Sequence, residues 1–227
     1  MMDTVVIGAT GGIGAALSDA LEQRGDRVLR IGRRTTPGLD LLDEASIVAA
    51  ARAVGDGFHL GLRLVIDATG FLHDARFQPE KSLRQVDAAQ MAHSFAINAT
   101  GPALLMKHFL PLLARDGRAV FATLSARVGS IADNRLGGWY SYRASKAALN
   151  QILRTAAMEL VRTRPQTICV ALHPGTVGTT LSAPFAKGGL EVQGPAQSAV
   201  RLLAVIDRLT PAETGLFLDH HGALIPF

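Results

Sequence analysis

The sequence predicts a three-layer α/β fold, in which one doubly wound parallel sheet carries helices on both faces in a single domain over residues 1–227. Short apolar, β-branched runs alternate with longer stretches of helical periodicity along the whole chain, a pattern typical of β–α–β units with right-handed crossovers. Most of the short runs are apolar at nearly every position, as expected of strands covered by helices on both faces. The chain has 227 residues, of which 48% are hydrophobic and 19% charged, which suits one globule with a large core.

The expected elements follow one another without a repeat, linker or low-complexity segment. Six strands are expected at Thr4–Ile7, Arg27–Ile31, Leu62–Asp67, Ala119–Thr123, Gln166–Leu172 and Leu216–Leu218. Five helices are expected at Gly12–Arg24, Asp43–Val54, Ala88–Ala114, Ser141–Arg162 and Pro195–Leu209. The connection from Ile31 to Leu39 is too short for a crossover helix, so Gly38–Leu41 is expected to form a short strand reached by a loop. The stretch richest in Pro and Gly, Ala183–Pro195, is expected to be a loop inside the domain.

Composition excludes several classes of protein. Lys plus Arg exceeds Asp plus Glu by 23 − 19 = 4, and the basic residues are scattered, which argues against a nucleic-acid partner. The single cysteine, Cys169, lies in an apolar run and is expected to be a buried strand residue, so no disulfide framework is predicted. Met1-Met2-Asp3 leads directly into the first strand, without a basic segment or a long apolar stretch. These features favour a cytoplasmic protein with no membrane association, and we expect no metal site.

A glycine-rich turn follows the first predicted strand, in Gly8-Ala9-Thr10-Gly11-Gly12-Ile13-Gly14. Gly8 permits a tight turn, Gly12 lets the backbone approach a pyrophosphate, and Gly14 allows close packing of helix on strand. Phosphates would then bind the free N–H groups at the helix N-terminus. A purely structural turn is the alternative, but the strand–turn–helix context at the first strand favours dinucleotide binding.

Three residues separate Gly8 from Gly12, and this spacing resembles the Rossmann-like short-chain dehydrogenase/reductase family. The second predicted strand ends in Ile31-Gly32-Arg33-Arg34. An acidic residue there would bind the adenosine ribose 2′-hydroxyl, whereas an arginine suits a 2′-phosphate. We therefore expect NADP(H) in preference to NAD(H), with Arg33 as first contact and Arg34 as second; two solvated arginines are the alternative.

The resemblance implies further dinucleotide contacts. Asp40 matches the family's acidic residue that contacts adenine, and Asp67-Ala68-Thr69-Gly70 stands where the family has an Asn-Asn-Ala-Gly turn, with Asp67 able to cap it. The stretch from His173 to Thr179 matches the Pro-Gly turn at the nicotinamide, and the loop after it, through Gly194, matches the substrate lid. There Val177 would donate its backbone N–H to the carboxamide, and Thr179 would hold the amide or the pyrophosphate. His173 is expected to be a capped turn residue and not a base. The full expected set is Gly8, Thr10, Gly12, Ile13, Gly14, Arg33, Arg34, Asp40, Ala68, Thr69, Gly70, Tyr142, Lys146, Pro174, Gly175, Val177 and Thr179.

Proton chemistry is predicted for Tyr142 and Lys146, which are four residues apart and therefore share one helix face. A phenol ionises near pH ~10, and a neighbouring ammonium together with an oxidised nicotinamide is expected to lower this pKa. The pair matches the family's Tyr-x-x-x-Lys motif. The resemblance implies that Tyr142 exchanges the proton of the carbonyl or alcohol oxygen, while Lys146 also holds the nicotinamide ribose. An exposed helical pair is the alternative, and the glycine turn earlier in the chain argues against it.

Two further catalytic candidates come from the same resemblance. Asn98 would bend its helix and order a water that links the lysine to solvent; a surface asparagine is the alternative. The serine position departs from the family, because counting back from Gly129 puts Ala126 where the carbonyl-polarising serine stands. Two interpretations remain open: Ser125 supplies the hydroxyl after a local backbone shift, or the site relies on Tyr142 alone. We take Ser125 forward as the candidate.

The resemblance covers nearly the whole chain, and Gly129–Asn134 and Tyr140–Lys146 are similar to the C-factor/sniffer-like carbonyl reductases. It implies an oxidoreductase that interconverts a small carbonyl compound, an aldehyde or ketone, and an alcohol by hydride transfer with NADP(H). The alternative is a dinucleotide-binding signalling or scaffold protein with vestigial catalysis, which Ala126 supports. The helices Ala88–Ala114 and Ser141–Arg162 resemble those that pair in family dimers, so a homodimer or homotetramer is expected.

Overall fold

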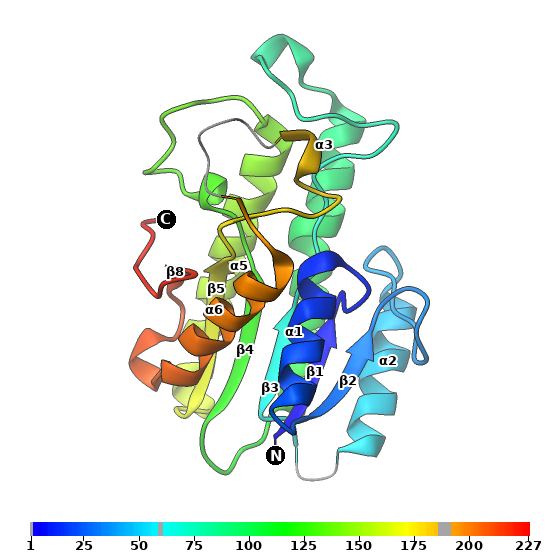
Figure 1. Ribbon diagram of the computed structural model, residues 1–227, viewed down its shortest axis with the longest axis vertical. Helices are drawn as coiled ribbons and strands as arrows, with labels where there is room; N and C mark the ends of the chain where they lie inside the picture. Colours follow the sequence, from blue (N-terminus) through cyan, green and yellow to red (C-terminus); the bar gives the residue numbers. More distant parts are fainter. Residues whose placement is uncertain (1, 59–60, 186–191) are drawn as a thin grey trace.

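The computed structural model describes residues 2–58, 61–185 and 192–227. Its central sheet has six parallel strands in the order β2-β1-β3-β4-β5-β8 (Figure 1). These strands are β1 (Asp3–Ile7), β2 (Arg27–Ile31), β3 (Leu64–Asp67), β4 (Ala119–Leu124), β5 (Thr167–His173) and β8 (Phe217–Asp219). The chain leaves β1 in one direction along the sheet to β2, and then continues on the other side with β3. In open α/β sheets, ligands bind at the carboxyl ends of the strands beside such a reversal.

Helices cover both faces of the sheet, as the sequence predicts. They are α1 (Gly12–Gln23), α2 (Glu44–Gly57), α3 (Ala88–Phe95), α4 (Gly101–Phe109), α5 (Tyr140–Thr163) and α6 (Pro195–Arg208). In Figure 1, α1 and α6 lie side by side over one face, and α3 lies beyond the carboxyl ends of the strands. Residues of α2, α4 and α5 pack on the opposite face. The three-layer α/β prediction is therefore confirmed.

Consecutive strand residues face opposite helix layers, which explains why the strands are apolar at nearly every position. Val5 and Ile7 of β1 belong to the core formed with α2, α4 and α5. Val6, between them, belongs to the core formed with α1 and α6. All three are completely buried. A single polar substitution on either face of β1 would therefore place an unsatisfied group in a core.

The long helix predicted over Ala88–Ala114 is interrupted. The structure has α3, then a π-helical segment at Ala96–Thr100, then α4, and finally a short 3₁₀ turn at Leu110–Leu112. The Gly101 N–H bonds to the carbonyl of Ala96, five residues back, which marks the wider turn. A π-helical interruption therefore lies at Asn98, where a bend is expected from the sequence, and the prediction of one continuous helix is wrong.

The short strand predicted at Gly38–Leu41 is also not a strand. A single bridge joins Gly32 to Gly38, and the Leu39 N–H bonds to the Gly32 carbonyl at 3.0 Å. The hydroxyl of Thr35 accepts from the Gly32 N–H at 2.8 Å and donates to the Pro37 carbonyl at 2.7 Å. These local bonds close a tight loop and leave no run of backbone groups for a ladder.

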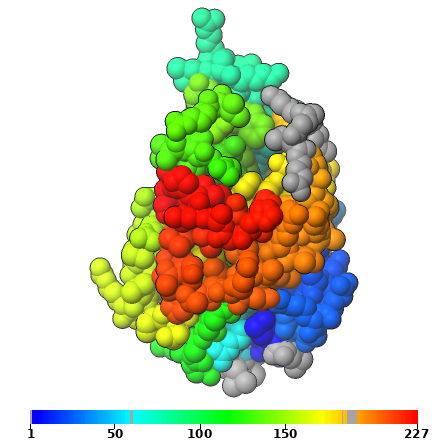
Figure 2. All heavy atoms as spheres, turned by 60° about the vertical axis from the view of Figure 1, so that its left-hand side comes forward, coloured from blue at the N-terminus to red at the C-terminus, as the bar shows by residue number. Residues whose placement is uncertain are grey.

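Two short strands follow the carboxyl end of β5. β6 (Thr176–Val177) pairs with β7 (Val192–Gln193) in a separate two-stranded sheet. The chain end returns to the same end of the sheet: Figure 2 shows residues near the C-terminus against the segment that precedes α5, where the Ala132 N–H bonds to the Phe227 carbonyl at 3.2 Å. Among the described residues, no helix combines the length and the apolar character needed to span a membrane.

Candidate active site

The glycine turn after β1 is shaped by close backbone contacts. Gly8 has φ +83°, and a Cβ there would lie 2.9 Å from the backbone of Ala68, so this left-handed residue lets the ends of β1 and β3 approach. A Cβ at Gly14 would lie 2.2 Å from the Gly8 carbonyl oxygen. α1 begins after Gly11 without a side-chain cap and has no acidic residue in its first turn. Its free N–H groups and positive dipole end are therefore open to an anion.

Two predicted cofactor residues, Thr179 and Thr10, connect this turn to neighbouring segments. A Cβ at Gly12 would lie 2.8 Å from Cγ2 of Thr179, so Thr179 reaches the turn from the chain after β5. A Cβ at Gly32 would lie 3.1 Å from Oγ1 of Thr10, which places Thr10 beside the end of β2. Segments far apart in the sequence thus surround one surface at the α1 N-terminus.

The basic pair after β2 is exposed. Arg33 and Arg34 lie in the turn that follows the strand. Arg30, three residues before Arg33 on β2, differs because its guanidinium is paired with Asp19 at 2.6 Å and with Glu22 at 2.8 Å. Asp40 is exposed as well, and its carboxylate accepts the Leu42 N–H at 3.0 Å.

Lys146 is buried, with 3% of its surface exposed, on the face of α5 that also carries Tyr142. Its Nζ donates to the Leu124 carbonyl at 2.8 Å. Burial lowers the pKa of the ammonium to about 8, although the carboxylate of Asp67 acts to raise it. Lys146 therefore titrates close to neutral pH, which an exposed lysine would not do.

The phenol of Tyr142 has its pKa raised to about 12 by burial. The sequence predicts a lowered pKa for the complex with the oxidised nicotinamide, which stays a prediction, whereas the protein by itself shows a shift in the opposite direction. The physical reason is that desolvation of the ring acts alone on the phenol, while the buried ammonium of Lys146 is directed at the Leu124 carbonyl. A phenol in this environment is protonated at neutral pH, the form that can donate a proton.

The turn after β3 meets Lys146 and Asn98. Asp67 caps this turn as predicted, since its carboxylate accepts the Thr69 N–H at 3.0 Å, and it also accepts the Thr123 hydroxyl at 2.7 Å. A Cβ at Gly70 would lie 3.6 Å from Nζ of Lys146 and 3.8 Å from Oδ1 of Asn98. These three predicted residues therefore come together at the carboxyl edge of the sheet.

Asn98 is completely buried in the π-helical segment. Its Oδ1 accepts the Phe71 N–H at 2.7 Å, and its Nδ2 donates to the Phe71 carbonyl at 2.8 Å and to Ser145 Oγ at 3.1 Å. The alternative of a surface asparagine is thus excluded. The Asn98 side chain thus joins the segment after β3, through Phe71, to α5, through Ser145, the residue before Lys146.

The hydroxyl of Ser125 points to α5. It is 4% exposed, and its Oγ donates to Oδ1 of Asn150 at 2.7 Å. Ala126, the next residue, is half-buried and carries no hydroxyl. The main chain then returns to α5 at Gly129, where a Cβ would lie 2.8 Å from Cβ of Lys146. This close contact fixes the position of the segment beside the catalytic candidates.

The Pro174–Gly175 turn follows β5, and Val177 lies buried in the small β6–β7 sheet. The hydroxyl groups of Thr179 and Ser182 form a hydrogen bond of 3.2 Å. The pKa of His173 is lowered to about 4. Burial is the largest cause, and electrostatic interactions with His220 and Arg127 act in the same direction. The Nδ1 of His173 accepts the Arg127 N–H at 3.4 Å, so His173 is a neutral residue, and it is the last residue of β5 and not part of the turn expected from the sequence. Part of the predicted lid, 186–191, lies outside the described residues.

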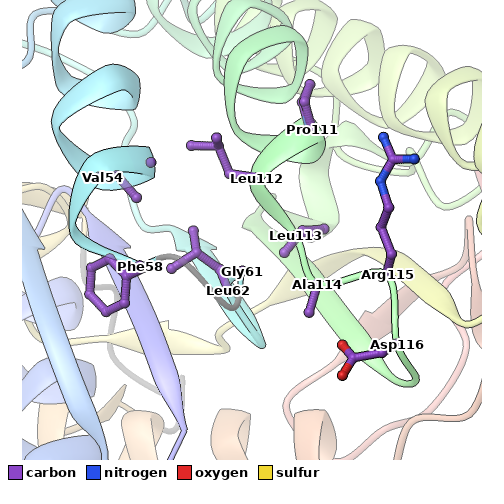
Figure 3. A pocket seen from close by; sticks show the side chains of 11 residues that line it. Val54, Phe58, Gly61, Leu62, Pro111, Leu112, Leu113, Ala114, Arg115 and Asp116 are labelled. Atoms are coloured by element: carbon purple, nitrogen blue, oxygen red, sulfur yellow. The ribbon is translucent and has the colours of Figure 1, made fainter.

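Two cavities differ in their relation to this edge of the sheet. The larger, about 560 Å³, lies at the amino ends of β3 and β4, between the end of α2 and the Leu110–Leu112 turn (Figure 3). It is far from the carboxyl edge where ligands of open α/β sheets bind. The smaller, about 200 Å³, lies behind the Pro-Gly turn and is polar, lined by His173, Arg201 and His220 among others.

Sequence reasoning missed two polar residues of α5 and its surroundings. Asn150 lies four residues after Lys146 and eight after Tyr142, and a polar residue on this buried helix face was a detectable signal. Glu80, 2% exposed, accepts bonds from the first turn of α5. No sequence signal identified it, because it lies in a segment without a predicted element.

Comparison with known proteins gives one family for the whole chain. A family model described as Enoyl-(Acyl carrier protein) reductase matches residues 8–218. The C-signal protein of Myxococcus xanthus is 40% identical over 148 residues, which are 64% of this chain and 84% of that protein. The 1-hydroxy-2-glutathionyl-2-methyl-3-butene dehydrogenase of Rhodococcus sp. (strain AD45) is 30% identical over 99% of both chains.

Solved structures agree with these matches. The NADPH-bound carbonyl reductase from chicken fatty liver superimposes with a TM-score of 0.86 at 28% identity, over 100% of this chain and 99% of that one.

Proposed function

The chain belongs to the short-chain dehydrogenase/reductase family and is therefore an oxidoreductase, and we propose that it transfers hydride between NADP(H) and a small aldehyde or ketone. Within the family it is similar to C-signal and to carbonyl reductases. The observation that carries this proposal is the meeting of Lys146, Asn98 and Gly70 at the carboxyl edge of the sheet, with Tyr142 one turn before Lys146 on α5. This arrangement supplies a proton donor next to a surface suited to a dinucleotide.

The residues present fit a dinucleotide. The backbone at Gly8, Gly12 and Gly14 approaches neighbouring segments so closely that a Cβ at any of them would lie under 3.0 Å from another atom. The uncapped N-terminus of α1 and Thr179 would hold the pyrophosphate, and Gly70 with Lys146 would hold the nicotinamide ribose. Tight contacts at the turn and an open helix end are the two properties that pyrophosphate binding requires.

NADP(H) is favoured over NAD(H) by charge. The exposed guanidinium groups of Arg33 and Arg34 follow β2, whereas Arg30 is neutralised by two carboxylates of α1. We propose Arg33 as the main 2′-phosphate ligand, with Arg34 and Thr10 beside it. The similar chicken carbonyl reductase was solved with NADPH, which supports this choice.

When bound, the reduced nicotinamide supplies the hydride, and this chain's own residues handle the proton. In carbonyl reduction, Tyr142 donates its phenolic proton to the carbonyl oxygen, since burial keeps the phenol protonated at neutral pH. The charge of Lys146 then stabilises the phenolate. The proton lost by Tyr142 is replaced through Lys146, with Asn98 and its water path as the proposed route to solvent.

The sequence leaves two interpretations of the hydroxyl that would polarise the substrate carbonyl. Ser125 could serve only if its Oγ left Asn150, and the hydrogen bond of 2.7 Å between them opposes this. The geometry therefore favours the second interpretation of the sequence, in which Tyr142 alone contacts the carbonyl oxygen. Ala126 lies where the family places its serine.

The test is NADPH oxidation against a panel of uncharged aldehydes and ketones, comparing Tyr142→Phe with Tyr140→Phe. Loss of general acid catalysis should lower turnover by about a hundredfold or more in Tyr142→Phe. Tyr140, two residues away, provides the matched control and should retain turnover. Equal activity of the two variants would contradict the mechanism. Tight NADPH binding without turnover on any carbonyl would favour the signalling or scaffold alternative, for which Ala126 is the supporting observation.

We also propose a homodimer or homotetramer that pairs through α3–α4 and α5, to be tested by light scattering. A cytoplasmic location is proposed as well, since Cys169, the chain's one cysteine, is buried and forms no disulfide.

A further inference from the structure

Glu80 is a buried carboxylate that the proposed chemistry does not use. It lies in the segment between β3 and α3, which rises beside α3 at the carboxyl edge of the sheet (Figure 1), and it is 2% exposed. Its carboxylate lies at the beginning of α5, 61 residues further along the chain. Buried carboxylates of this kind need hydrogen-bond donors, and here the donors belong to the helix that carries Tyr142.

The N-terminus of α5 lacks a cap of its own. Trp139 occupies the N-cap position with φ 53° and ψ 44°, and it makes no side-chain capping bond. It is the single non-glycine residue with positive φ in the described part of the chain. Such a conformation is costly for a tryptophan, so the surroundings must hold it in place.

Glu80 supplies the missing cap from outside the helix. The Ser141 N–H donates to both carboxylate oxygens, at 3.3 and 3.2 Å, and the Ser141 hydroxyl donates to Oε1. The main-chain carbonyl of Glu80 accepts the Trp139 N–H at 2.5 Å. One residue thus satisfies two of the backbone donors that a helix start leaves unpaired, and its charge lies at the positive end of the helix dipole.

The segment that carries Glu80 is itself held in place. The Gln90 side chain of α3 donates to the Gln78 carbonyl at 2.7 Å. The Lys81 N–H donates to Oε1 of Gln85 at 2.7 Å. Glu80 therefore joins α5 to a segment with its own fixed backbone, and not to a free loop.

The capped turn carries the aromatic groups of the site. Tyr142 follows Ser141 directly, and its ring lies edge-on to Trp139 with centroids 6.1 Å apart. Trp139 also lies edge-on to Phe185, with centroids 5.3 Å apart. Any movement of the first turn of α5 would therefore shift the phenol and the aromatic surface beside it together.

We propose that Glu80 is a positioning residue, which fixes the first turn of α5 and thereby sets Tyr142 and Trp139 relative to the cofactor and substrate. This inference rests on the proposed function, because positioning matters for turnover only if Tyr142 donates the proton. Removal of the carboxylate loosens the turn, and small displacements of a proton donor lower turnover strongly. A cap that served stability alone would lower the melting temperature without this effect.

The experiment compares Glu80→Ala and Glu80→Gln with Glu213→Ala. Glu213 is a matched control, since its carboxylate also accepts the N–H and the hydroxyl of one residue, Thr210, at a helix start, but on a short helix that follows α6. Trp139 is the chain's one tryptophan, so intrinsic fluorescence reports on this turn directly. Fluorescence, acrylamide quenching, kcat and the KM for NADPH are measured below the melting temperature of every variant.

Glu80→Ala should shift the emission of Trp139 to longer wavelength, increase its quenching, and lower kcat by about tenfold to a hundredfold with a smaller change in the KM for NADPH. Glu80→Gln, which keeps one acceptor oxygen and is less disruptive to folding, should show the same changes at smaller amplitude. Glu213→Ala should lower only the melting temperature. Parental fluorescence or parental kcat in both Glu80 variants would overturn the proposal. Full activity of Tyr142→Phe would instead overturn the proposed function, and the fluorescence of the Glu80 variants would still decide whether the cap exists.

Discussion

Ser125 donates its hydroxyl proton to the side-chain oxygen of Asn150 over 2.7 Å, and thereby ties the end of β4 to the middle of α5. Both side chains are almost completely buried, with 4% and 2% exposed. The bond explains why a serine follows β4 even though the next residue, Ala126, cannot polarise a carbonyl. In this site the serine joins two elements, and we propose that substrate activation is left to Tyr142.

This relationship predicts opposite effects for two neighbouring substitutions. Ser125→Ala removes a buried hydrogen bond and should lower the free energy of unfolding by about 1 to 3 kcal/mol, while turnover falls less than about tenfold. Ala126→Ser adds a hydroxyl where the family places it, and should raise kcat for ketones. Chemical denaturation and steady-state kinetics on both variants measure these effects. A collapse of turnover in Ser125→Ala, with Ala126→Ser unchanged, would identify Ser125 as the polarising hydroxyl.

Cofactor preference is predicted to depend on Arg33. Arg33→Asp replaces a 2′-phosphate ligand with a carboxylate that suits a ribose 2′-hydroxyl. A charge-assisted bond contributes about 1.5 to 3 kcal/mol, so affinity for NADPH should fall about tenfold to a hundredfold. Affinity for NADH should rise in the same variant. Dissociation constants from fluorescence titration, with Arg52→Asp on α2 as a charge control, check the reversal; an unchanged ratio of the two affinities would exclude Arg33.

The fold was predictable because its signals are local and repeated. The alternation of buried strands such as β1 with amphipathic helices depends only on neighbours along the chain. The break at Asn98 was partly predictable, since a resemblance indicated a bend but could not show that a π-helical turn absorbs it. The segment Gly38–Leu41 was mispredicted because the hydrogen bonds of Thr35 close a loop that no apolar pattern reveals.

The site was predictable to the extent that its members lie in contiguous motifs. Tyr142 and Lys146 share a helix face, and the turn of Asp67 follows a strand, so each could be placed once its motif was matched to the family's order of elements. Glu80 could not, because its partners begin 59 residues later, at Trp139, and only the packing of the tertiary fold brings them together. The raised pKa of Tyr142 was missed for the same reason, as burial depends on every segment around the ring.

The pH dependence of carbonyl reduction should show the titration of Lys146. Its pKa is lowered to about 8, so the ammonium is present below that pH and lost above it, while the phenol of Tyr142 at about 12 stays protonated throughout. The rate at saturating NADPH should therefore be level near neutrality and fall as the pH rises through about 8. A pH profile on the parent and on Lys146→Arg, which stays charged, measures this. An alkaline limb close to the pKa of Tyr142 would assign the titration to the phenol instead.

Stability in acid should depend on His173. Burial first, and then His220 and Arg127, lower its pKa in the folded protein to about 4, against 6.5 for an ordinary histidine. Between these values the unfolded chain binds more protons than the folded one, so the free energy of unfolding falls as the pH drops from 6.5 towards 4. The loss attributable to this side chain is about 3 kcal/mol at most, and it is absent above pH 6.5.

His173→Asn keeps an acceptor for the Arg127 N–H without the titration, and should flatten this part of the curve in denaturation measured across the range. An equally steep acid limb in His173→Asn would show that other groups carry the protons.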